Sequence, residues 1–281
     1  MSTAPVGVGH DHTATRAALA GSAARIAALV ASQPDGTLRL PRSEWAVSDV
    51  AAHLMIGFRG YTDAALGEAE RWRLHIVEGA GFPERVRVFN QRTLAGAARL
   101  DPDAGAVAIV EAARRFLDET GGLDAAAPVV TPWYGEGASV SVAAATSLLL
   151  GEQLVHGRDL ARALRRPWPI TPSDATLVLE AFRAMIPIAL NPATAGHLTA
   201  AYELRVGPGV RFVVRLAGGR VTVEESVGQA VDCRVAADPV ALLLVGYGRT
   251  TQWPAIARGR LVAWGRRPWL GPRFPGLFYT P

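Results

Sequence analysis

Residues 151–160 read Gly-Glu-Gln-Leu-Val-His-Gly-Arg-Asp-Leu, inside a largely apolar segment from Ser141 to Leu164 that predicts a long helix. Glu152 and His156 stand four positions apart, so in a helix their side chains lie on the same face. A carboxylate and an imidazole placed in this way can bind one metal ion, and they can equally form a simple surface pair. A catalytic metal site needs a third protein ligand from elsewhere in the chain.

His53 is the candidate for that third ligand. It lies in a second predicted helix, from Asp49 to Leu66, on or beside the apolar stripe, with Ser48 as the expected N-cap. A histidine on such a face is either a hydrogen-bonded core residue or a ligand, and the helix alone leaves both interpretations open. If the two helices are neighbours in an antiparallel bundle, the chain supplies two imidazoles and one carboxylate, a common set in catalytic zinc sites.

The composition is that of a folded protein with a sizeable core. The chain has 281 residues, of which 49% are hydrophobic and 19% charged, and its length favours two domains. The net charge is +4 and all 29 basic residues are arginines, but no stretch is densely basic with interleaved aromatics, so nucleic-acid binding is not supported. The single cysteine, Cys233, excludes an intramolecular disulfide and a cysteine-based zinc cluster.

The sequence shows no pattern typical of a signal peptide or a membrane span. The N-terminus lacks a basic region followed by an apolar one, and no uncharged apolar stretch of about 20 residues is found, so the sequence predicts a cytoplasmic protein without a membrane span. Residues 1–12, which include His10 and His12, are expected to form a flexible leader.

The first half of the chain predicts an up-and-down bundle of long helices over residues 13–168. An irregular segment, 127–138, comes just before the helix that carries Glu152. It contains Trp133 and Tyr134, and it predicts either a pocket wall or a hydrophobic clamp. The helices are expected at residues 13–32, 49–66, 83–100, 104–119 and 141–164.

The second half changes pattern and predicts a small α+β domain over residues 172–281. A helix from 172 to 190 is followed by strand patterns separated by glycine turns, and then by a short helix with Asp238 as N-cap. Cys233 is expected to be a half-buried strand residue. The strands are expected at residues 201–206, 210–216, 221–224 and 231–235.

Two segments carry a family resemblance. Residues 45–54, Trp-Ala-Val-Ser-Asp-Val-Ala-Ala-His-Leu, resemble the W-S/T-V-x-D-V-x-A-H-L segment of the mycothiol-dependent maleylpyruvate isomerase family. Residues 152–163 resemble its E-x-x-V-H-G-x-D-L-A-R-A segment. The resemblance implies a DinB-like helical bundle followed by a small sterol-carrier-like α+β domain. The tail from Trp253 to Pro281 departs from the isomerase and resembles a paralogous branch.

The resemblance also implies a metal site. Carried over residue by residue, it gives a divalent metal, normally zinc, bound by His53, Glu152 and His156. Asp49 and Asp159 match recurring acids of the family, which either cap and pair locally or support a ligand imidazole. Trp45 is expected to be a core residue.

Family members use a low-molecular-weight thiol. The metal converts it to a thiolate, which adds to an electrophilic carbon of a small, carboxylate-bearing substrate. In the isomerase, rotation and elimination follow; in transferase relatives the adduct is the product. An arginine of the second domain is expected to bind the substrate carboxylate, and Arg249 matches best, with Arg258 and Arg260 as rivals.

The sequence therefore predicts a zinc-dependent thiol enzyme, an isomerase or S-transferase with mycothiol as the implied cosubstrate. One alternative is a metal-dependent lyase or hydrolase without a thiol. The other is a non-enzymatic binder of a small apolar ligand. The expected partners are a small thiol and a small electrophile, with neither nucleic acid nor membrane, in a monomer or homodimer.

Overall fold

The computed structural model describes residues 12–41 and 43–280, which form two compact units, 12–170 and 171–280. Each unit is described by itself. Most of the expected leader, including His10, lies outside the described residues, whereas His12 already belongs to the first helix.

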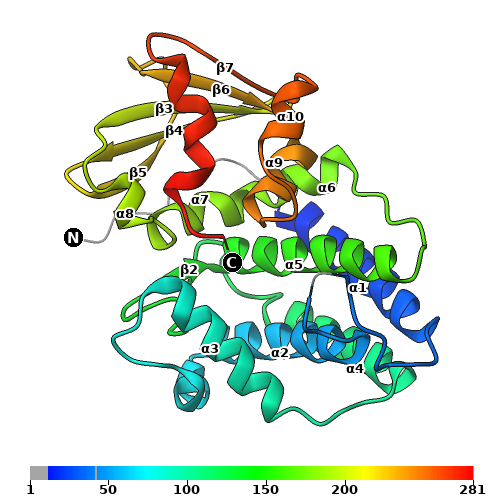
Figure 1. Ribbon diagram of the computed structural model, residues 1–281. Helices are drawn as coiled ribbons and strands as arrows, with labels where there is room; N and C mark the ends of the chain where they lie inside the picture. The colour runs from blue at the N-terminus through cyan, green and yellow to red at the C-terminus, as the bar shows by residue number, and fades with distance from the viewer. Residues whose placement is uncertain (1–11, 42, 281) are drawn as a thin grey trace. The chain divides into compact units, whose positions relative to one another are not determined.

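Four long helices form the first unit (Figure 1). Helix α1 packs against α4 and α5, and α2 packs against α4 and α5 as well. Two shorter helical segments lie next to α2. The elements are α1 (His12–Ala31), α2 (Val47–Ala65), η1 (Ala69–His75), α3 (Phe82–Ala95), α4 (Pro102–Glu119) and α5 (Val142–Ala163).

Helix α1 is long and apolar enough to cross a membrane by length and composition alone. In the bundle it buries Leu19, Ile26 and Val30 completely. Its Arg16 donates hydrogen bonds to Thr120 and to the Leu117 carbonyl of the neighbouring helix region. These contacts make α1 a packed bundle helix.

Two local predictions in this unit are wrong. Ser48 does not cap α2; instead the Asp49 carboxylate accepts the backbone N–H of Ala46, at 2.8 Å. The segment expected to be irregular contains an antiparallel ribbon, β1 (Pro128–Val130) paired with β2 (Ser139–Ser141). The long helix α5 follows directly, and the Ser141 hydroxyl caps it by accepting the Ala144 N–H.

The second unit is a five-stranded sheet in the order β5-β4-β3-β6-β7, antiparallel except for the parallel pair β3–β6. The helix expected at 172–190 is broken at Val178 into two. The elements are α6 (Pro172–Leu177), α7 (Leu179–Ile188), α8 (Pro192–Ala195), β3 (Ala200–Val206), β4 (Val210–Ala217), β5 (Arg220–Glu225), β6 (Cys233–Ala237), α9 (Pro239–Gly246), α10 (Trp253–Ala257), β7 (Leu261–Trp264) and η2 (Pro268–Leu277).

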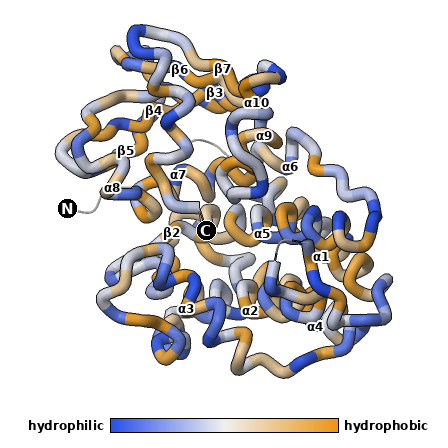
Figure 2. Tube along the Cα trace, in the orientation of Figure 1, coloured by the Kyte–Doolittle hydropathy of each residue, from blue (hydrophilic) through white to orange (hydrophobic). Residues whose placement is uncertain are grey.

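Alternation along β3 sorts its side chains between the two faces of the sheet. Tyr202, Leu204 and Val206 are buried in the apolar core with residues of α7, α9 and η2. Figure 2 shows this mixture of hydrophobic and hydrophilic residues along the strands. Glu203 and Arg205 alternate with the core residues and therefore belong to the opposite face.

The predicted fold class is confirmed: a helical bundle is followed by a small α+β unit. Cys233, expected to be half-buried, is fully buried in β6. Asp238 caps α9 as predicted, its carboxylate accepting the Ala241 N–H at 2.8 Å.

Candidate metal centre

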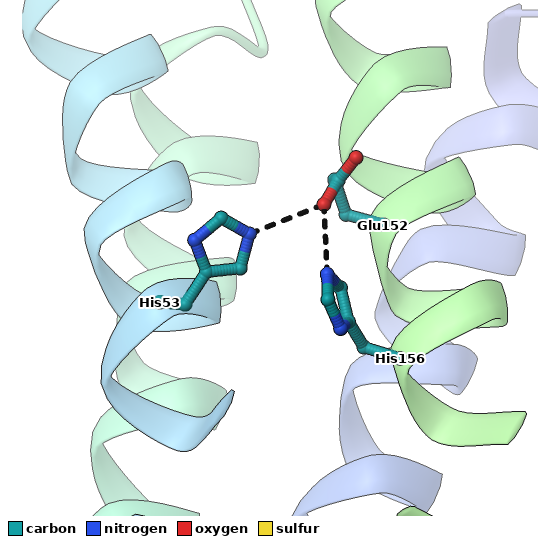
Figure 3. A group of neighbouring side chains, drawn as sticks. All are labelled: His53, Glu152 and His156. Atoms are coloured by element: carbon teal, nitrogen blue, oxygen red, sulfur yellow. Dashed lines mark hydrogen bonds and ion pairs between the residues drawn. The ribbon is translucent and has the colours of Figure 1, made fainter. Parts of the chain in front are cut away.

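The structure brings His53, Glu152 and His156 together between α2 and α5 (Figure 3). The Nε2 atom of each imidazole lies 3.2 Å from the same carboxylate oxygen, Oε2 of Glu152. One potential ligand atom from each residue lies within 4.8 Å of the other two. The ligand set predicted from sequence is thus a spatial cluster.

Helix α5 holds its two site residues on a rigid scaffold. Between Glu152 and His156 in sequence, Leu154 and Val155 are fully buried. One residue after His156, Gly157 lies directly against the Trp168 ring, so a Cβ at this position would collide with the indole. Trp168 in turn donates its Nε1–H to the Leu154 carbonyl at 3.0 Å. The glycine of the second motif therefore permits the packing that fixes this part of α5.

The electrostatics of the cluster favour an ionised carboxylate. Burial alone would raise the pKa of Glu152, but hydrogen bonds from His156 and His53, with their charge, lower it well below its ordinary range. The Glu152 side chain nevertheless keeps 27% of its surface exposed, against 9% for His156. The cluster is charged, pre-assembled and open to solvent on the glutamate side.

Trp45 covers one side of the cluster. Its ring centroid lies 4.8 Å from that of His53 and 5.6 Å from that of His156, nearly parallel to the latter. Sequence reasoning placed Trp45 in the core, but it is only half-buried. Its contact with both imidazoles makes it part of the site's wall, which the first motif, with Trp45 and His53 eight residues apart, could have signalled.

Two tyrosines interact electrostatically with Glu152, and sequence reasoning had singled out only the segment of Tyr134. The hydroxyls of Tyr61, on α2, and Tyr134, in the β1–β2 connection, lie 2.7 Å apart. Burial, with a smaller contribution from the Glu152 charge, raises the pKa of Tyr134 to about 12, against lowering contributions from the hydrogen bonds to Tyr61 and Trp133. Burial, with added repulsion from Tyr134 and Glu152, also raises the pKa of Tyr61. Both phenols are therefore neutral at physiological pH.

The segment 128–138 packs against α2 through two aromatic residues. Trp133 is buried and packs its ring edge-on against Tyr61, with centroids 5.3 Å apart. Tyr134, the next residue, is half-buried and carries the hydroxyl that meets Tyr61. The hydrophobic clamp is therefore confirmed for Trp133, while the pocket wall stays a prediction.

Each of the remaining candidates has a contact of its own. Asp49 caps α2, as described above, and the Asp159 carboxylate lies 4.0 Å from Nη1 of Arg158. Arg249 belongs to the second unit, where it is half-buried and donates from Nη1 to the Tyr247 carbonyl at 2.8 Å. Its rivals Arg258 and Arg260 are exposed.

The donor set fits a divalent metal. Two imidazole nitrogens and one carboxylate oxygen, with a solvent-open side, are the ligand composition of many catalytic zinc sites. A cation here would replace the two hydrogen bonds that now hold Glu152, so the side chains are already directed at the position it would occupy.

Comparison with known proteins gives a matching family model and several similar solved structures. The family model described as "Mycothiol maleylpyruvate isomerase N-terminal domain" matches residues 15–161. A solved mycothiol-dependent maleylpyruvate isomerase is 16% identical, with 90% of this chain and 91% of that chain covered and a TM-score of 0.48. A histidine-to-alanine mutant of such an enzyme is 14% identical, covering 90% and 93%, with a TM-score of 0.49.

A "UbiJ-SCP2 Ubiquinone synthesis protein" is 18% identical and covers 36% of this chain and 93% of its own, with a TM-score of 0.30. No curated protein matches the chain. The family model covers more than half of the sequence, including all three clustered side chains. By that match, the chain belongs to the mycothiol maleylpyruvate isomerase N-terminal domain family.

Proposed function

We propose that this protein is a zinc-dependent thiol enzyme, an isomerase or S-transferase of the mycothiol type. Family membership supports a thiol-dependent, isomerase-type activity. The observation that carries the metal is the convergence of His53 and His156 on one oxygen of Glu152, with that carboxylate held ionised and partly exposed.

A divalent cation bound by these residues would lower the pKa of a coordinated thiol, so that the thiolate forms at neutral pH. The protein's own contribution is positioning. His53 and His156 come from different helices and fix the ligand directions, while Trp45 closes one side of the cluster. The exposed side of Glu152 leaves an approach for the thiol and its electrophile.

In this proposal Arg249 binds a substrate carboxylate, because a guanidinium forms a bidentate pair with such a group. Arg249 is half-buried and donates to the Tyr247 carbonyl, whereas Arg258 and Arg260 are exposed, so the Arg249 side chain has less conformational freedom. Loss of turnover in Arg249→Ala with full metal content and unchanged thiol binding is the expected result. Equal turnover in that variant would reassign the role.

Metal analysis followed by thiol titration tests the proposal. The full chain, purified without chelator, is expected to contain one equivalent of zinc, and the cobalt-substituted form is expected to change its visible spectrum on addition of mycothiol. His53→Ala and His156→Ala should each lose the metal, whereas the exposed His197→Ala should keep it. Metal without a thiol response would instead favour a lyase or hydrolase, and full metal in both histidine variants would refute the ligand set.

A second candidate function rests on the second unit. A cavity of about 220 Å³ there is lined almost entirely by apolar side chains, including Leu204, Val235, Ile256 and Phe274. Such a cavity suits a small apolar ligand. Saturable binding of a fluorescent fatty acid, unaffected by zinc removal, would support a binding function; no uptake of the probe would remove this candidate.

A further inference from the structure

Outside the three clustered side chains, the tyrosine pair has an unused hydrogen-bond donor, and Gly57 lies on the same helix as Tyr61. Tyr61 and Tyr134 share one hydrogen bond, 2.7 Å long. Two hydroxyls carry two protons, and this bond uses one of them. Among the described residues, the other proton meets no acceptor, so the pair has one O–H left to donate.

A buried donor without an acceptor is costly, unless water or a ligand accepts from it. Here the pair consists of neutral phenols, because burial and the Glu152 charge raise the pKa of both hydroxyls. The one O–H that the pair has left stays protonated and suits an anionic oxygen, since a hydrogen bond to a charged acceptor is the stronger kind.

Glu152 connects this pair to the metal centre. One of its oxygens meets both imidazoles, and the second is directed away from them (Figure 3). The charge of this carboxylate acts on both tyrosines and raises the pKa of each. With a divalent cation bound and the imidazoles neutral, the centre would carry one net positive charge, which favours an anion between the cation and the phenols.

Gly57 lies on α2 between His53 and Tyr61 and presents no side chain there. This residue follows His53 by one helical turn on α2 and is only half-buried. A Cβ added there would meet only Cδ2 of Leu149, at 3.7 Å, in ordinary van der Waals contact. Beside Gly57 there is therefore room for at least a methyl group, on the same stretch of α2 that carries both His53 and Tyr61.

We propose that Tyr61 and Tyr134 form a hydrogen-bonding site for a carboxylate or enolate oxygen of the substrate, which lies over Gly57. This deepens the proposed function and rests on it, because it assigns these two tyrosines to an oxygen of the anionic substrate. Tyr134, whose hydroxyl is held by Tyr61, and Tyr61 act together as positioning residues.

Maleate dianion is the probe, titrated by calorimetry into the zinc-loaded full chain. We expect the wild-type protein to bind maleate, and Tyr61→Phe and Tyr134→Phe to bind it about tenfold more weakly, as loss of a hydrogen bond to a charged group predicts. Zinc content and the cobalt spectrum with thiol should not change. Tyr202→Phe, which removes a buried phenol from the second unit, is the matched control and should bind maleate as the wild type does.

Two further measurements separate a binding role from a structural one. Dimethyl maleate, which carries no charge, should lose no affinity in the phenylalanine variants, whereas general distortion of the site would weaken both probes alike. Gly57→Leu should abolish maleate binding with zinc retained, and Gly57→Ala, which fits the space, should bind maleate within a few-fold of the wild type.

The proposal is overturned if the zinc-loaded wild type does not bind maleate, if either phenylalanine variant binds maleate normally, or if Gly57→Leu retains affinity. Failure of the proposed function has a different signature, namely absence of zinc or of a thiol-induced spectral change in the wild type. Maleate affinity therefore tests the tyrosine site, while zinc content and the thiol-induced spectrum test the proposed function.

Discussion

Two glutamates, one in each unit, are held by pairs of basic side chains, and the pairs differ in kind. Glu152 receives two imidazoles at 3.2 Å. Glu203, on β3, receives Arg205 at 2.8 Å and Arg234 at 3.0 Å. Its second oxygen accepts the Ser226 hydroxyl at 2.7 Å.

Only the side chains around Glu152 can exchange their hydrogen bonds for bonds to a metal ion; the ion pairs of Glu203 cannot. An imidazole can give up its proton and bind a cation, whereas a guanidinium stays protonated and binds no metal. Glu203 is also only 8% exposed, with both of its oxygens engaged, while Glu152 is 27% exposed. The first arrangement can release its hydrogen bonds in favour of a metal, and the second can only stabilise the sheet.

The same substitution at both positions should have different effects on zinc affinity. Glu152→Gln removes the anionic ligand, so zinc affinity is expected to fall by at least about a hundredfold, since even loss of a residue that only supports a ligand costs 10–100-fold. The metal-free protein should also lose some stability, because a neutral amide oxygen accepts weaker hydrogen bonds than the ionised carboxylate does. Competition with a zinc chelator and urea unfolding measure the two quantities.

Glu203→Gln should leave zinc affinity unchanged and lower the free energy of unfolding by about 2 kcal/mol. This is less than the usual loss for a broken buried ion pair, because Arg205 and Arg234 are each about one-third exposed and solvent screens them. Urea unfolding of the metal-free chain measures it. A stable Glu203→Gln protein with impaired zinc binding would show that the comparison is wrong.

The stabilising role of Glu203 also predicts how the stability of the protein depends on pH. Burial raises the pKa of Glu203, but hydrogen bonds from Ser226 and Arg205 outweigh it and the folded-state pKa is lowered. A lowered pKa means that the ion pairs stabilise the fold above the unfolded value of about 4.3 and lose this contribution as pH falls through the folded value. Acid titration of unfolding in the wild type and in Glu203→Gln should show a smaller loss in the variant.

The smallest expected effect concerns Asp49. Because its carboxylate accepts the Ala46 N–H, Asp49→Ala should cost about 1 kcal/mol, the ordinary value of a helix N-terminal cap. Zinc affinity should stay within a few-fold of the wild type. A loss of affinity beyond tenfold would instead assign Asp49 a supporting role toward His53.

The long periodic elements of this chain were predictable, and the reason is visible in α5. Its apolar residues recur at helical spacing, Ser141 is a good cap, and Glu152 and His156 share a face by geometry alone. The assignment of His53 as the third ligand depended on a second predicted helix and on the family motif. Residue spacing along one helix carries no information about which other helix lies opposite.

Short elements, and aromatic residues that both pack in the core and form a hydrogen bond, were not predictable in this way. The ribbon of β1 and β2 has three residues per strand, too few for an alternating pattern to be recognised. Tyr61 lies on an apolar helix stripe, where an aromatic residue indicates packing, and only the approach of Tyr134 gives its hydroxyl a polar neighbour. The break at Val178 has no glycine or proline at that residue to mark it.

The contact between Gly157 and Trp168 decides where the bundle can be cut. Trp168 lies beyond the last residue of α5, yet its ring packs on that helix and is covered by the Arg25 guanidinium, 4.2 Å from the ring centroid. A fragment ending at Leu164 would expose the glycine surface and lose the hydrogen bond to the Leu154 carbonyl. A recombinant bundle intended for metal-binding measurements should therefore extend through Ile170, so that the Trp168 ring still packs on α5 and stabilises its C-terminal end.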